Sequence, residues 1–220
     1  MKTSIRSIIP FLALALILGS CKKNNDSTTV SYKVKAINKS SAVARLAGGI
    51  INWTSGTGYV REIELEAEKD SSEVDFKSIV SRRIDLFATL SDLGSITLPP
   101  GIYKEIEIEI NFESVLPDTA FVLNGSFTNS SSGITPVVFI ISDPVKIESE
   151  ANNITISGSN NYTAITSLDF SLLTNGITEN MLNNATRTNG IIVISKTENS
   201  NLYNIIINNM DDMDSVDLED

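Results

Sequence analysis

The chain has 220 residues, with 27 acidic and 17 basic side chains, a formal net charge of −10, no histidine and one cysteine. Such an acidic chain is repelled by nucleic acid phosphates, so we expect no nucleic acid partner. The lack of histidine excludes a Ser-His-Asp relay and an ordinary catalytic zinc site, and a single cysteine cannot form an internal disulfide.

The remaining enzymatic chemistries have no motif in this sequence. Two carboxylates suffice for glycoside hydrolysis, but no spacing picks out a pair among the acidic residues. No phosphate-binding or dinucleotide-binding glycine motif is present. We therefore predict a non-enzymatic protein without a cofactor.

The N-terminus has the features of a signal peptide over residues 1–20. Lys2 and Arg6 precede an apolar run that would cover roughly 20 Å as a helix, which is shorter than a bilayer core of about 30 Å. The run ends in Leu18-Gly19-Ser20-Cys21, which resembles the bacterial lipobox. This resemblance implies cleavage before Cys21, acylation of its sulfur and amino group, and a membrane partner through that lipid anchor. The alternative is an ordinary secretory signal with an incidental cysteine.

Residues 21–29 follow as a flexible tether, since 22–29 contain no apolar side chain. Lys22 stands where an aspartate would favour inner-membrane retention, so we expect the outer membrane, with the periplasmic or surface face left open. The use of Asn, Ile, Ser and Thr resembles that of Bacteroidetes proteins. Removal of residues 1–20 leaves 15 basic against 27 acidic side chains, a formal charge of −12.

Beyond the tether, apolar and polar residues alternate with a period of two, which predicts half-buried strands. The apolar positions of three such ladders are Tyr32, Val34 and Ala36, then Ile63, Leu65 and Ala67, then Ile106, Ile108, Ile110 and Phe112. Alternation of this kind favours antiparallel pairing, because parallel strands are covered on both faces. Further strands are expected at 84–87, 120–128, 136–142 in the centre of a sheet, 145–149, 154–157, 168–173 and 191–195.

These short strands, separated by Gly, Pro and Asn clusters, predict a mainly β protein: an antiparallel β-sandwich, Ig-like or transthyretin-like, over 30–210. A subdivision near residue 117 is left open. One or two short helices are expected near the C-terminus, one with Thr178 and one with Ser200 as the N-cap. Residues 211–220 are expected to form a disordered acidic tail without a metal site.

Two ladders carry glutamates on their polar side, at Glu62, Glu64 and Glu66 and at Glu105, Glu107 and Glu109. Like charges repel across strands, so we expect these two strands not to pair with each other and a strand bearing Lys33 and Lys35 to lie beside one of them. We interpret the glutamates as a solvated face that discourages edge pairing, with a bound calcium ion as the alternative.

Trp53 and Tyr59 are the candidate ligand-binding residues. A flat aromatic ring stacks on a sugar face, and Tyr59 follows Trp53 beyond a glycine-containing turn. The alternative is that Trp53 fills the core of the sandwich.

Three segments, "GIINWTSGTGYVREIELEAE", "RRIDLF" and "ITLPPGIYKEIEIEINFE", resemble a β-sandwich family of Bacteroidetes lipoproteins of unknown function. The resemblance spans 30–113 and implies no catalytic residues. We therefore expect a lipid-anchored binding or accessory protein of the cell envelope, with glycan or protein as its partner. The alternative is a fimbrillin-like assembly subunit, which requires an exchangeable strand, an apolar groove and processing at Arg45 or Arg61.

Overall fold

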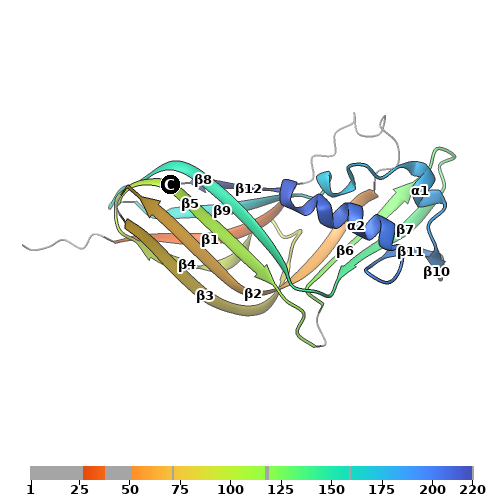
Figure 1. Cartoon of the computed structure of the whole chain (residues 1–220), viewed down its shortest axis with the longest axis horizontal. Helices are drawn as coiled ribbons and strands as arrows, with labels where there is room; N and C mark the ends of the chain where they lie inside the picture. Colours follow the sequence, from red (N-terminus) through yellow and green to blue (C-terminus); the bar gives the residue numbers. More distant parts are fainter. Residues whose placement is uncertain (1–26, 38–50, 71, 117–118, 159, 220) are drawn as a thin grey trace, which may run out of the picture.

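The computed structural model describes residues 27–37, 51–70, 72–116, 119–158 and 160–219. The signal peptide, Cys21, most of the tether and Arg45 lie outside these residues. The described chain is mainly β, with two sheets that pack as a sandwich at one end of an elongated molecule and short helices beside the larger sheet at the other end (Figure 1).

The smaller sheet has four strands. In spatial order they are β12 (Asp214–Glu219), β9 (Tyr162–Asp169), β1 (Thr28–Ile37) and β4 (Ser91–Leu98). The larger sheet has eight strands, of which β3 (Ser72–Asp85) lies beside the long strand β2. The other strands follow the order β10 (Arg187–Thr188), β11 (Ile191–Ile194), β7 (Ile134–Ile141), β6 (Phe121–Thr128), β2 (Ile51–Lys69), β5 (Gly101–Phe112) and β8 (Val145–Ile156).

Strand β2 joins the two ends of the larger sheet. Its first part pairs with β6, and its second part lies between β3 and β5. The pairing register shifts between Trp53 and Ser55 and again between Val60 and Glu62, which allows one strand to change partners along its length. Gly58 permits close packing at this crossing, since a Cβ there would lie 2.4 Å from Cε1 of Phe112.

The three predicted ladders are confirmed. Their inner residues are buried, from Val34 of β1 through Leu65 of β2 to Ile108 of β5, and only Ala36 is half-buried. Burial of each such aliphatic side chain stabilises the fold by about 1.5–3 kcal/mol. The expected position of 136–142 is also confirmed, because β7 lies between β6 and β11.

The two short helices form where the sequence predicts them. In α1 (Glu179–Asn183), the Thr178 side chain accepts a hydrogen bond from the Met181 backbone N–H, as expected of an N-cap. In α2 (Ser200–Asn208), the N-cap is Asn199 rather than Ser200, so that prediction is wrong by one residue. Asn199 has a left-handed backbone, a conformation that asparagine tolerates better than serine.

Pairing departs from the sequence expectation in two places. Strands β1 and β9 are parallel, as are β11 and β7, so the sheets are mixed rather than purely antiparallel. The prediction of a disordered acidic tail over 211–220 is also wrong, because Asp214–Glu219 forms β12 against β9. Val216 and Leu218 of β12 pack against the core, and this apolar alternation is hidden in the sequence by the surrounding carboxylates.

Candidate functional site

An acidic sheet face is the main functional candidate of the described structure. It is the outward side of β3, β2, β5 and β8, which lie side by side at the sandwich end of the molecule (Figure 1). We call this surface the acidic face. Its four cross-strand rows are Glu73, Glu68, Glu105 and Asn152; Asp75, Glu66, Glu107 and Glu150; Lys77, Glu64, Glu109 and Glu148; and Ile79, Glu62, Asn111 and Lys146.

The expectation that the two glutamate ladders avoid each other is wrong. Glu64, Glu66 and Glu68 of β2 lie directly opposite Glu109, Glu107 and Glu105 of β5. The lysine-bearing strand β1 lies in the other sheet, between β9 and β4. Burial of the inner residues explains this pairing, since each contributes about 1.5–3 kcal/mol against a few tenths of a kcal/mol lost per like-charge pair.

Lysines bridge carboxylates in the third and fourth rows, which form one end of the acidic face. The Lys77 Nζ lies 2.7 Å from carboxylate oxygens of both Glu62 and Glu64. These hydrogen bonds raise the pKa of Lys77 to about 12. Lys146 bridges two further glutamates in the same way, with Nζ–oxygen distances of 2.9 Å to Glu109 and 2.5 Å to Glu148.

At the other end, Lys104 Nζ lies 3.7 Å from Glu68 and 3.4 Å from Asp70. Each end of the face therefore has ammonium groups of the chain itself between pairs of carboxylates.

The second row, which we call the central row, consists of Asp75, Glu66, Glu107 and Glu150. Within the described residues, none of these four forms an ion pair with a lysine or arginine. Partial burial, followed by repulsion from Glu148, Glu66 and Glu150, raises the pKa of Glu107 above its ordinary value. At the β3 end, repulsion from Asp75 is the largest cause of a raised Glu73 pKa.

Three groups of three carboxylates on this face each bring one oxygen per residue within 4.8 Å of the others. The groups are Glu66, Glu73 and Asp75; Glu105, Glu107 and Glu150; and Glu107, Glu109 and Glu148. Calcium takes six to eight oxygens that converge on the ion, whereas side chains of a sheet project side by side from one surface. The donor chemistry fits a cation, but the extended arrangement fits several separate positive groups better than one enclosed ion.

The predicted sugar platform at Trp53 and Tyr59 is wrong as a surface site. Trp53 is only 2% exposed, and its ring packs against Phe139 with a centroid distance of 6.4 Å. Tyr59 is half-buried and lies between the buried residues Gly58 and Val60, on the other side of the strand from them. Trp53 thus fills the core, which is the alternative reading of the sequence.

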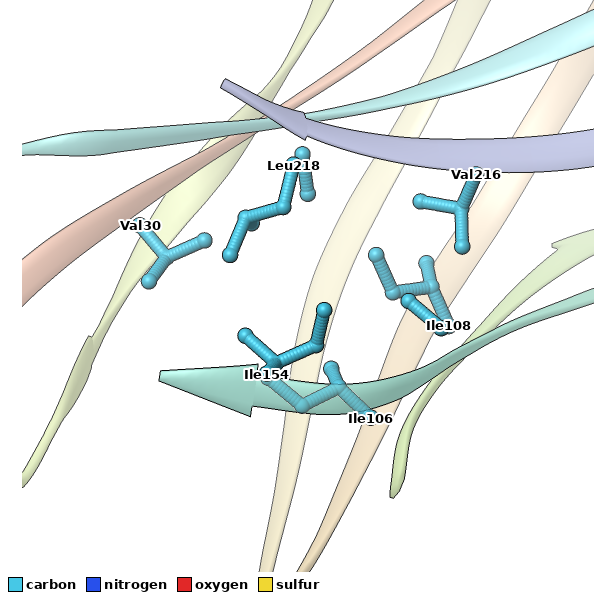
Figure 2. Close-up of a pocket in the computed structure, with 8 residues that line it drawn as sticks. Val30, Ile106, Ile108, Ile154, Val216 and Leu218 are labelled. Carbon is cyan, nitrogen blue, oxygen red and sulfur yellow. The ribbon is translucent and has the colours of Figure 1, made fainter. Parts of the chain in front are cut away.

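An apolar cavity lies between the sheets, under β12, and Figure 2 shows the carbon side chains that surround it. Val30, Ile106 and Leu218 are among its lining residues. Its volume of about 10 Å³ is at the lower limit for a single water molecule, so it cannot hold an organic ligand.

The acidic face contains residues that sequence reasoning missed, namely Glu73 and Asp75 of β3 and Glu148 and Glu150 of β8. The signal was present, because "EVDF" and "KIESE" also alternate apolar or small residues with acidic ones.

No helix among the described residues is both long and apolar enough to cross a membrane. Comparisons with protein-family models, with curated proteins and with solved structures find no match for this chain.

Proposed function

We propose that this chain is a lipid-anchored, non-enzymatic binding protein of the bacterial outer membrane, acylated at Cys21, whose acidic face binds a basic protein partner. The central row is the observation that carries this proposal. Its four carboxylates cross four neighbouring strands without a lysine or arginine partner among the described residues. A partner that places positive side chains there would neutralise a repulsion that the fold otherwise retains.

Two lysines at one end of the acidic face illustrate the binding geometry. Lys77 and Lys146 each place one ammonium group between two carboxylates of the face, at 2.5–2.9 Å. A partner lysine between Glu66 and Glu107 would make the same kind of charge-assisted contact. We prefer a basic protein to a calcium ion because the carboxylates project side by side along an extended face and do not converge on one point.

Fluorescence anisotropy with a labelled decalysine peptide tests the binding face. We expect binding that weakens as salt rises and that is reduced about tenfold or more in the variant E66Q/E107Q/E150Q. The matched control is D211N/D217N/E219Q, which removes the same amount of charge from exposed residues near the C-terminus. Equal loss in both variants would show a general charge effect and contradict a binding face. A calcium-induced rise in melting temperature that is lost only in E66Q/E107Q/E150Q would favour the ion instead.

Labelling of cells with a radioactive fatty acid tests the anchor. The wild-type chain should incorporate label and fractionate with the outer membrane, whereas Cys21→Ala should do neither. Label on the Cys21→Ala chain, or an unlabelled wild-type chain, would contradict lipidation at this residue.

A fimbrillin-like assembly subunit is the second candidate. It is favoured by β12, a strand near the C-terminus that, among the described strands, pairs with β9 alone and covers the apolar cavity through Val216 and Leu218 (Figure 2). Arg61 argues against processing at that site, because it lies within β2, where it donates a hydrogen bond to Ser81 and lies 3.5 Å from Glu113. Polymers on native gels that disappear on truncation at Asp214 would support this candidate.

A further inference from the structure

We propose that the partner binds as an extended strand that adds to the open edge of β3, with basic residues on its outer side and apolar residues on its inner side. This inference rests on the proposed function of the acidic face. It goes further by naming the form of the partner and the place where it docks.

Strand β3 is the available edge of the acidic face. Among the described strands it pairs only with β2, so one side of its backbone has no strand partner there. The strand at the opposite edge of the face, β8, is in contact with β12 of the smaller sheet. At the C-terminal end of β3, the Arg82 side chain donates a hydrogen bond to the backbone oxygen of Asp92 in β4. The open edge is therefore the stretch from Ser72 to Val80.

The inner side of this edge lacks part of its cover. Val74, Phe76 and Val80 pack against the core but are only half-buried, whereas Ala67 and Leu65 of β2, which lie opposite Val74 and Phe76, are fully buried. An additional strand with apolar residues on its inner side would cover them. Cross-strand apolar pairs of this kind are a main source of sheet stability.

The side chains on the outer side of the same edge determine which charges a docking strand must carry. Glu73 and Asp75 are exposed, and repulsion from Asp75 raises the pKa of Glu73. Lys77 follows but is already bonded to Glu62 and Glu64. A fitting strand therefore has basic residues opposite Glu73 and Asp75 and a neutral or acidic residue opposite Lys77. Strand addition gives affinity through backbone hydrogen bonds and specificity through the alternate side chains.

Two peptides of the same composition separate strand addition from simple charge attraction. Both are as long as the open edge. The first, the alternating peptide, has valine at every second position, lysines opposite Glu73 and Asp75, and threonine opposite Lys77. The second has its lysines in one block. We expect the alternating peptide to bind about tenfold more tightly or better, and to slow hydrogen exchange of β3 amides but not of β8 amides. Alternate backbone N–H groups of a strand point to opposite edges, so only one alternating set can bond to β3. N-methylation of that set should remove the advantage of the alternating peptide, whereas N-methylation of the other set should leave it.

Charge reversal locates the edge. E73K/D75K should weaken the alternating peptide about tenfold more than E148K/E150K, the matched change on β8. Equal binding of the two peptides, with unchanged exchange in β3, would overturn strand addition while leaving the acidic face as a binding surface. Failure of both peptides and of decalysine to bind would overturn the proposed function as well.

Discussion

Glu107→Gln should stabilise the protein. Glu107 lies opposite Glu66 on one side and Glu150 on the other, so the amide removes two like-charge pairs and keeps the size of the side chain. At a few tenths of a kcal/mol per pair, the gain in unfolding free energy should be about 0.5–1 kcal/mol at neutral pH and low salt. For a domain of this size, that gain raises the melting temperature by about 1–4 °C.

The gain should depend on pH. Because the folded-state pKa of Glu107 is raised, the native protein holds this proton more tightly than the unfolded chain does. The loss of stability that ionised Glu107 causes is absent below the unfolded-state pKa of about 4.3 and complete above the folded-state pKa. Urea unfolding should therefore show a stabilised variant at about pH 7.5 and no difference from wild type at about pH 4. High salt should reduce the gain at neutral pH.

Glu64→Gln is the matched control, because its carboxylate accepts a hydrogen bond from Lys77 at 2.7 Å. Loss of an exposed ion pair costs between zero and about 1 kcal/mol, so this variant should gain nothing. Equal gains in Glu64→Gln and Glu107→Gln, or a loss in Glu107→Gln, would refute the claim that the central row retains unrelieved repulsion.

Three further changes test the fold. Trp53→Ala should lose about 3–5 kcal/mol of unfolding free energy in urea because the indole is buried, and a loss under 1 kcal/mol would contradict its place in the core. Gly125→Ala should lose about 1–3 kcal/mol, since its Cβ would lie 2.5 Å from the Asn52 backbone oxygen; an unchanged melting temperature would show that this backbone yields. Asp214→Asn should stabilise the protein at neutral but not at acidic pH, because burial raises the Asp214 pKa. Hydrogen exchange in β12 measures this last effect, and slower exchange at both pH values would contradict it.

The alternation of apolar residues was enough to predict the main strands and the sides they bury. It specifies which face of a strand meets the core, and Ile106, Ile108 and Ile110 lie there as expected. It does not specify neighbours, since those depend on contacts between distant segments, such as the parallel pairing of β1 with β9. The glutamate ladders were therefore assigned to the correct side of their strands and to the wrong neighbours.

Strand β3 and most of β9 were harder to predict, each for a different reason. Strand β3 carries charges and serines on an edge, so its apolar residues are only half-buried and their period is weak. In β9, Ala164, Ile165, Thr166 and Ser167 are all buried, which removes the alternation that marks a half-exposed strand. Consecutive buried residues show that both faces of β9 are buried, and this depends on segments that are distant in the sequence.

The charges on the outer sides of the two sheets distinguish two explanations for the acidic face, namely solubility and the binding of a basic partner. Solubility requires charge somewhere on the surface, and the smaller sheet meets this need with mixed signs, since Lys33 and Asp217 flank Ile165 in register. The larger sheet instead places four carboxylates in one row, where neutral side chains would stabilise the same pairing. Folding thus opposes this arrangement, and solubility does not require it. The proposed basic partner would account for this arrangement, because its binding would neutralise the repulsion between carboxylates that the fold has already assembled. If E66Q/E107Q/E150Q kept its affinity for decalysine while losing solubility, the opposite explanation would be correct.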